Sequence, residues 1–183
     1  MDVKIKVEMT PNPNALKFVT NYNVMNQDRR SFDAAEQCEG IPLAQELLNL
    51  EGVIQVHFFE NVITITQNGL ADWGELEERV KNKMRELLPT HDPNIILQEN
   101  EGKSAVEMTP EMIKVNEILD HTIRPALQGD GGDLEVLALE ENRLYVKYQG
   151  ACGGCPSASM GTLAAIEGIL RDQFRPDVEV HAM

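Results

Sequence analysis

The sequence predicts an α+β fold of two small domains, each a short β-sheet with helices packed on one face. Segments that alternate apolar and polar residues, as half-buried strands do, are interleaved with segments whose apolar residues recur at helical spacing. The same series occurs on both sides of residues 98–108, which contain few apolar residues and no clear period. We therefore expect a linker at 98–108 between domains at 1–97 and 109–183.

The first domain combines alternating segments, a helix-start signal and a turn. We expect strands at 3–7, 15–19, 53–59 and 62–67, and helices at 42–50 and 73–88. Asp72 is placed to cap the second helix, with Glu75 in the reciprocal position of a capping box. Residues 62–67 should form a hairpin with 53–59, turned at Glu60-Asn61, where Asn tolerates a positive φ.

The second domain begins with a strong helix signal, in which Thr109 is the N-cap and Pro110 the first helical residue. We expect this helix to end before the glycine-rich run at 129–132, with its last turn distorted by Pro125. A hairpin of 134–139 and 143–148, a helix at 157–174 and a strand at 178–180 should follow.

Composition narrows the class of function. With 16 basic and 30 acidic residues the net charge is −14, which disfavours a nucleic-acid backbone or an anionic membrane as partner. The longest apolar runs, such as residues 95–97, are far too short to span a bilayer. Because neither an apolar signal core nor an Arg-rich presequence opens the chain, we expect a cytoplasmic protein.

The chemistry of the sequence is concentrated in Cys152 and Cys155. Their Cys-x-x-Cys spacing lets both sulfurs converge on one metal centre or on each other, and Gly153 and Gly154 keep side chains out of the way. Cys155 should lie at the start of the last helix, where unpaired N–H groups and the helix dipole favour the thiolate, the form that binds metal.

Ligand number leaves several functions open. An iron–sulfur cluster and a structural zinc ion each require about four protein ligands, and this loop supplies two. The simplest way to reach four is a second copy of the loop from a twin subunit. A thiol–disulfide oxidoreductase remains an alternative, although a thioredoxin-like site would follow a strand in a βαβ pattern, whereas the residues before this loop predict a hairpin.

Other reactive side chains favour structural roles. Cys38 is the remaining thiol and lies beside acidic residues, which argues against a reactive thiolate. The four histidines show no paired ligand spacing. Asp130 and Asp133, flanked by glycines after a helix, are expected to be turn and capping residues.

Two stretches resemble a known family. Residues 123–133, Ile-Arg-Pro-Ala-Leu-Gln-Gly-Asp-Gly-Gly-Asp, and 150–156, Gly-Ala-Cys-Gly-Gly-Cys-Pro, resemble the NifU C-terminal domain. Residues 1–90, with Thr-Pro-Asn-Pro-Asn-Ala-Leu-Lys-Phe at 10–18, resemble the N-terminal domain of Nfu proteins. The order of the two domains is the one expected for Nfu.

The resemblance implies an iron–sulfur cluster scaffold or carrier and not an enzyme. Carried over by position, the ligands are Cys152 and Cys155, which would hold a [4Fe–4S] cluster between the subunits of a homodimer. Four thiolates would also hold a [2Fe–2S] cluster. The implied partners are apo iron–sulfur proteins as acceptors and upstream cluster assembly proteins, with the first domain assisting partner recognition.

Overall fold

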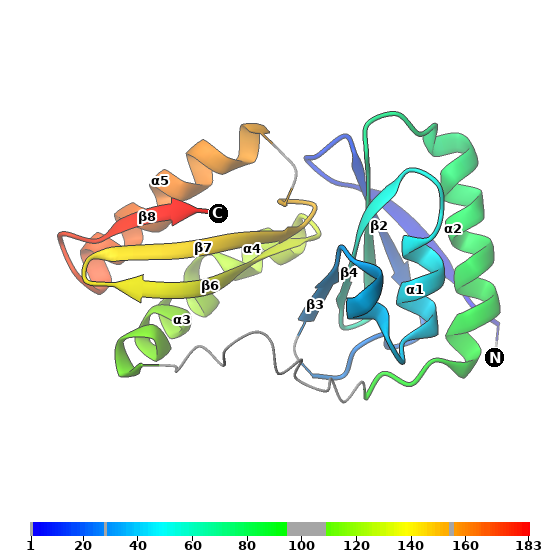
Figure 1. The fold of residues 1–183 in the computed structure, drawn as a ribbon, viewed down its shortest axis with the longest axis horizontal. Coiled ribbons are helices and arrows are strands. Elements are labelled where there is room, and N and C mark those ends of the chain that lie inside the picture. Colours follow the sequence, from blue (N-terminus) through cyan, green and yellow to red (C-terminus); the bar gives the residue numbers. More distant parts are fainter. Residues whose placement is uncertain (1, 28, 95–108, 154–155) are drawn as a thin grey trace. The chain divides into compact units, whose positions relative to one another are not determined.

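The computed structural model describes residues 2–27, 29–94, 109–153 and 156–183. The chain divides into two compact units, residues 1–96 and 97–183 (Figure 1). Each unit contains one β-sheet and its own helices, which confirms the predicted α+β class. The predicted linker at 98–108 lies outside the described residues.

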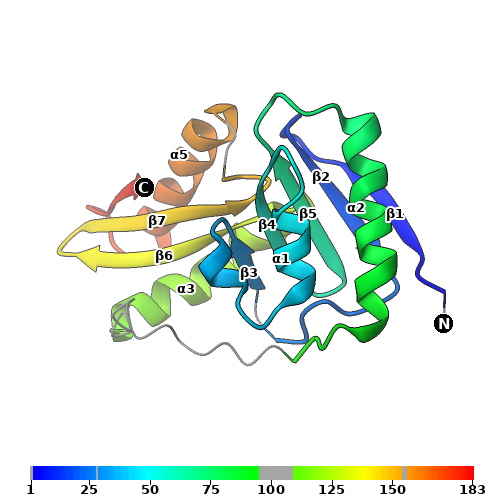
Figure 2. The ribbon, with the colours of Figure 1, turned by 45° about the vertical axis from the view of Figure 1, so that its right-hand side comes forward.

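The first unit is built on a five-stranded antiparallel sheet in the order β1-β2-β5-β4-β3, with β5 between β2 and β4 (Figure 2). Its strands are β1 (Ile5–Met9), β2 (Ala15–Thr20), β3 (Arg29–Phe32), β4 (Val53–Phe59) and β5 (Val62–Gln67). Its helices are α1 (Pro42–Leu48) and α2 (Trp73–Leu87), with short 3-10 turns η1 (Ala35–Cys38) and η2 (Leu88–Thr90).

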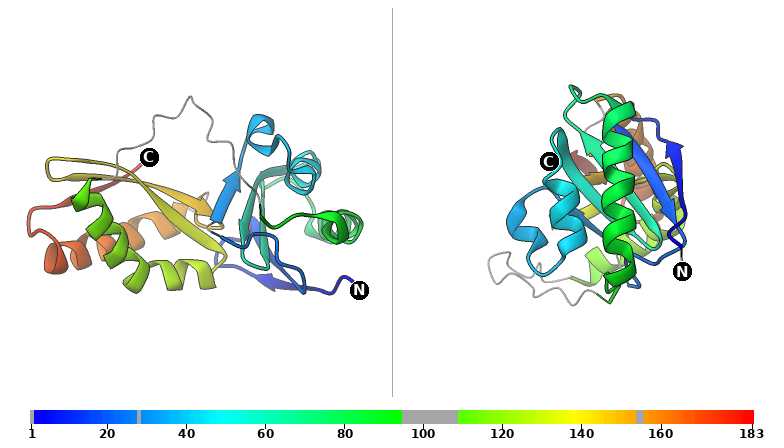
Figure 3. Two further views of the ribbon diagram at one scale, coloured as in Figure 1. Left: turned by 90° about the horizontal axis from the view of Figure 1, so that it is seen from below. Right: turned by 90° about the vertical axis from the view of Figure 1, so that its right-hand side faces the viewer.

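Strand alternation directs the apolar residues of this sheet onto one face, where α1 and α2 cover them (Figure 3). Phe18, Phe58 and Ile63 of the sheet are fully buried, as are Leu47 of α1 and Val80 of α2. The Asp72 carboxylate accepts a hydrogen bond from the Glu75 N–H at 3.2 Å, so the predicted N-cap is confirmed.

The turn of the first hairpin differs from the sequence prediction in one detail, and the turn of the second hairpin shows the same feature. The positive φ falls on Glu60, at 48°, and on Glu141, at 54°, and not on the asparagine that follows each. Asn61 donates its side-chain N–H to the Thr20 carbonyl at 2.8 Å, and Asn142 donates likewise to Asp177 at 3.0 Å. Each asparagine thus ties its turn to a neighbouring segment, and the preceding Glu adopts the left-handed conformation.

The second unit has a three-stranded sheet in the order β6-β7-β8, with its helices on one face (Figure 3). Its elements are α3 (Pro110–Thr122), α4 (Arg124–Gly129), β6 (Gly132–Glu140), β7 (Arg143–Gly150), α5 (Pro156–Gln173) and β8 (Glu179–Ala182). The Thr109 hydroxyl accepts from the Met112 N–H at 3.2 Å, which confirms the predicted cap of α3. Among the described residues, every helix is too short or too polar to serve as a membrane span.

The first helical segment of this unit is interrupted at Ile123, two residues before Pro125. Pro125 has no N–H to donate to the carbonyl of His121, so the helix cannot continue unbroken through this point. The interruption confirms the expected distortion, and the short helix α4 that follows leads into Gly131 and β6.

The strand β3 of the first unit was not predicted. It is an edge strand of which Phe32 alone is buried, so its sequence carried no strand signal.

One buried histidine makes the stability of the first unit depend on pH. His57 on β4 is 2% exposed, and its Nδ1 lies 2.9 Å from the Ser31 hydroxyl on β3. Burial, followed by the charge of Arg29, lowers its pKa to about 4 from an ordinary value of 6.5. The ring is therefore neutral in the folded protein at neutral pH.

We expect His57 to favour unfolding as the pH falls. Because its folded pKa lies below its unfolded pKa, the unfolded chain binds the proton first, and stability present above pH 6.5 is lost as the pH falls to about 4. The full effect is on the order of 3 kcal/mol. Denaturant unfolding at several pH values should show a shallower loss over this window in His57→Gln; the same pH slope in both proteins would contradict the assignment.

Candidate metal centre

Cys152 lies in a tight turn directly after β7. Gly150 ends the strand with φ at 61°, in the left-handed region that favours glycine. The Ala151 N–H donates to the Gly131 carbonyl at 3.1 Å, and the Gly153 N–H donates to the Gly150 carbonyl at 3.0 Å. These bonds fix the backbone on both sides of Cys152, whose side chain is half-buried.

Gly132 forms the surface against which Cys152 packs. A Cβ atom at Gly132 would lie 2.3 Å from the Cys152 Sγ and 2.9 Å from its backbone nitrogen. Gly132 is the first residue of β6 and pairs in register with Gly150, so the two strand ends bring this contact about. The glycines after α4 therefore do more than end a helix, and sequence reasoning missed this role.

A buried ion pair supports the junction between α4 and β6. Asp133 is 0% exposed, and its carboxylate lies 3.5 Å from the Nε of Arg124, which is 4% exposed. The carboxylate also accepts from the Leu134 N–H at 2.7 Å and from the Gln128 amide at 3.1 Å. The prediction that Asp133 is a turn or capping residue is therefore wrong: it is a buried strand residue adjacent to Gly132.

Arg124 extends this network to α3. Its guanidinium donates to the Asn116 side chain at 2.7 Å and forms an ion pair with Asp120 one helical turn away. The distance of 3.5 Å between Arg124 Nε and Asp133 is too long for a good hydrogen bond, so their attraction is mainly electrostatic. Asp130, in contrast, is exposed at the end of α4, as a turn residue should be.

Tyr148 brings a phenol to the vicinity of Cys152. Its side chain points to the helix-covered face of β7 and is 8% exposed. The same buried cluster also packs against Cys152. Burial, and then the charge of Cys152, raises the pKa of Tyr148 to about 12, so the phenol is protonated at neutral pH.

The other two cysteines of the chain differ in what the structure describes of them. Cys155 lies outside the described residues; α5 begins at the next position, Pro156. Cys38 belongs to the first unit and is fully buried, with its sulfur 3.7 Å from the Ala34 carbonyl. Desolvation raises the pKa of its thiol, in line with a structural role. Within the described ranges, no three His, Cys, Asp or Glu side chains are grouped as a metal site.

The connection from β7 to β8 corrects one step of the sequence analysis. The strands pair in parallel, with α5 as the crossover, so the cysteine loop stands between a strand and a helix of a β-α-β unit. The preceding hairpin of β6 and β7 was correctly expected, but it does not exclude this arrangement. The argument against a thioredoxin-like site on grounds of topology is therefore removed.

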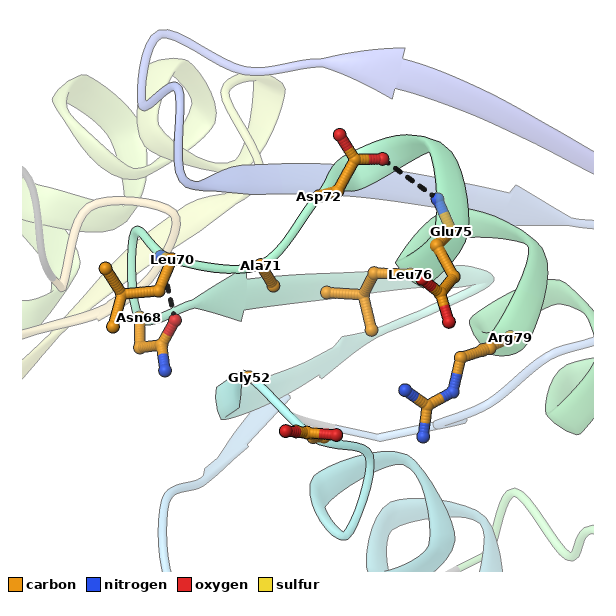
Figure 4. Close-up of a pocket in the computed structure, with 9 residues that line it drawn as sticks. Gly52, Asn68, Leu70, Ala71, Asp72, Glu75, Leu76 and Arg79 are labelled. Atoms are coloured by element: carbon orange, nitrogen blue, oxygen red, sulfur yellow. Dashed lines mark hydrogen bonds between the residues drawn. The ribbon is translucent and has the colours of Figure 1, made fainter.

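The first unit has a comparable hairpin-to-helix turn at residues 68–71, before α2. This turn lines an open pocket of about 350 Å³, together with Glu51, Asp72 and Arg79 (Figure 4). The lining contains carboxylates, an amide and a guanidinium but neither thiol nor imidazole. The two turns thus occupy corresponding places in their units, and the thiol of Cys152 lies in the second.

Comparisons with known proteins agree with this division. A family model described as a NifU-like domain matches residues 115–181, and one described as the N-terminal domain of scaffold protein Nfu/NifU matches residues 5–91. A human protein named NFU1 iron-sulfur cluster scaffold homolog, mitochondrial, is 31% identical over 177 residues, which cover 96% of this chain and 69% of that protein. The chain belongs to the Nfu family of iron–sulfur cluster scaffold proteins.

Two further matches to this Nfu protein have lower identity. NifU-like protein 4, mitochondrial, of Arabidopsis thaliana is 28% identical over 91% of this chain, and the chain spans 61% of its length. A solution structure of a NifU-like protein from Saccharomyces cerevisiae aligns with a TM-score of 0.47 and 20% identity, covering 54% of this chain and 87% of that one. A structural likeness of this size adds nothing to the family assignment.

The relatives overturn the predicted location. The human and Arabidopsis proteins are both named as mitochondrial, so the expectation of a cytoplasmic protein is wrong. That expectation used the composition of the first five residues, the last of which begins β1. A targeting signal is recognised separately from the folded domain, so the composition of a folded strand carries no information on compartment.

Gly132→Ala tests the contact with Cys152. The added methyl would overlap the thiol, so we expect a loss of about 1–3 kcal/mol in unfolding free energy together with a displaced Cys152 loop. Denaturant unfolding and the alkylation rate of Cys152 would report the two effects. Gly129→Ala is the matched control, because a Cβ there meets nothing within 4 Å; equal behaviour of the two variants would refute the close packing.

Asp133→Asn tests the buried ion pair. The substitution keeps the shape of the side chain but leaves Arg124 buried beside a neutral group. Breaking a buried pair in this way lowers the unfolding free energy by about 3–5 kcal/mol. Because Arg124 keeps its ion pair with Asp120, we expect a loss near the lower end of this range. Thermal or denaturant unfolding would measure it. Asp130→Asn, at an exposed carboxylate two glycines away, should change stability by less than about 0.5 kcal/mol.

Proposed function

We propose that this Nfu protein binds a [4Fe–4S] cluster through Cys152 and Cys155 at the interface of two subunits and transfers it to apo-proteins. The observation that supports it best is the position of Cys152: its backbone is fixed by Gly131 and Gly150, while its sulfur is half-buried at the end of β7. A thiolate held in this way can bind iron and still be approached by an incoming thiol.

Ligand number supports the need for a second subunit. A cubane cluster takes four protein ligands, and the sequence supplies two thiols in this loop. Cys38 is the third thiol of the chain, but its complete burial in the first unit withholds it from a shared cluster. Two copies of the loop would provide four thiolates. Four thiolates would also hold a [2Fe–2S] cluster, so the type of cluster has to be measured.

The glycines suit a cluster that is passed on. Gly153 follows Cys152 in the chain, is exposed and has no side chain, so sulfide and a second loop could approach the thiol from that side. Backbone N–H groups in such a turn can also donate to cluster sulfur. In this proposal the cluster is cargo, received from upstream assembly proteins and given to apo iron–sulfur proteins, and the first unit assists their recognition.

A thiol–disulfide oxidoreductase is the second candidate function. The observation that favours it is the β7-α5-β8 crossover, since a Cys pair before a crossover helix is the arrangement of thioredoxin-like sites. Such an enzyme would cycle between a Cys152–Cys155 disulfide and a dithiol, with two electrons supplied by an external dithiol. It would need neither metal nor a second subunit.

Anaerobic reconstitution with iron and sulfide separates the two functions. We expect one [4Fe–4S] cluster per dimer by metal, sulfide and visible-absorption analysis, with dimerisation upon loading. Cys152→Ser and Cys155→Ser should each abolish loading and remain folded, whereas Cys38→Ser, the matched control at a buried thiol, should load normally. Full loading of either loop variant would contradict the ligand assignment, and metal-free turnover of a disulfide substrate by the monomer would favour the oxidoreductase.

A further inference from the structure

The turn between β5 and α2 presents an apolar side chain at the rim of the open pocket in the first unit. Leu70 of this turn is 89% exposed, and Arg79 of α2 lies on the opposite side of the pocket (Figure 4). A single exposed leucine is common on protein surfaces and indicates nothing by itself. Leu70 differs from such a residue in the rigidity of its turn and in the charges across the pocket.

Hydrogen bonds from side chains fix this turn. Gln67, which is 5% exposed, accepts from the N–H groups of Gly69 and Ala71 at 2.9 and 3.0 Å and donates to the Ala71 carbonyl at 2.9 Å. The Asn68 side chain accepts from the Leu70 N–H at 2.9 Å. The backbone is thus ordered before any partner arrives, so ordering it adds little to the entropic cost of binding.

Two neighbouring turns brace the same segment. The Gly52 carbonyl accepts from the Asn68 N–H at 2.9 Å, and a Cβ atom at Gly52 would lie 2.7 Å from the Cβ of Ala71. In the Thr-Pro-Asn-Pro-Asn turn before β2, the Asn14 carbonyl accepts from the Gln67 N–H at 2.8 Å. This sequence motif therefore holds one wall of the pocket in place.

The charged groups of the pocket are available to a partner. Across the part of the chain that the structure describes, Arg79 takes part in neither a hydrogen bond nor an ion pair, and the same holds for the carboxylates of Glu51 and Glu75. Asp72, which caps α2, is a third carboxylate of the lining. Since three carboxylates face one guanidinium, the pocket favours an occupant with a positive charge.

We propose that this pocket binds a segment of a partner protein in which a lysine or arginine stands beside an apolar residue. The apolar side chain packs on Leu70, and the cation pairs with Glu51 and Glu75. The proposal rests on the part of the proposed function in which the first unit assists recognition, and it adds the site and the chemistry of the recognised segment. Complementary charge suits a partner that binds briefly, because it raises the rate of encounter more than the affinity.

Selection from a library of random dodecapeptides displayed on phage tests the proposal, with the full chain immobilised and no cluster bound. Peptides that place lysine or arginine next to leucine, isoleucine or phenylalanine should be enriched. An enriched peptide, synthesised with a fluorescent label, should bind the parent in a fluorescence polarisation assay and bind more weakly as salt is added, since salt screens exposed charges.

Matched variants assign the binding to the pocket. Leu70→Ser should weaken binding of this peptide about tenfold through lost apolar contact. Met9→Ser, at a side chain 87% exposed in the same unit but outside the pocket lining, should leave binding unchanged. Glu75→Gln should weaken binding about threefold, and Arg79→Gln, which removes a repelling charge, should strengthen it by a similar factor.

Four outcomes would overturn the proposal: enrichment of acidic peptides, no enrichment at all, weaker binding in Arg79→Gln, or equal binding by Leu70→Ser and Met9→Ser. Cluster loading is measured separately. Because Leu70→Ser leaves the cysteine loop intact, this variant should load iron and sulfide like the parent. Failure of the parent to load would overturn the proposed function, while the peptide assay would still decide the role of the pocket.

Discussion

The close contact between Gly132 and Cys152 is the constraint on which the site depends. The sulfur occupies the volume that any side chain at Gly132 would fill. The contact requires β6 and β7 to end in register, and it requires the chain between α4 and β6 to follow one path. The buried Arg124–Asp133 pair holds that path, because Asp133 is the residue next to Gly132. A charge pair in the core thus positions a thiol at the surface.

Each unit joins a hairpin to a helix through a short turn, and the two turns differ in chemistry. The first ends at an N-capped helix beside an open polar pocket, whereas the second contains Cys152 and several glycines. Both hairpins use an asparagine to anchor their turns to a neighbouring segment. Similar local architecture therefore supports different functions, because function follows from the residues placed at the turn.

A carrier must hold its cluster firmly enough to survive transit and loosely enough to release it. For the proposed cluster, the hydrogen-bonded backbone on both sides of Cys152 favours retention, whereas the partial exposure of its sulfur favours exchange. The acidic character of the chain, with a net charge of −14, keeps the protein soluble and disfavours nonspecific association with nucleic acid.

The sequence by itself determined the α+β class, the central hairpins and both helix caps, because these depend on local periodicity and capping. The tertiary structure alone decided the rest. Asp133 was expected in a turn, yet Arg124 on another element draws it into the core. Gly132 matters through a residue twenty positions away, and the β7-α5-β8 crossover depends on strand pairing. Contacts between distant residues leave no periodic signal in the chain, so only the fold reveals them.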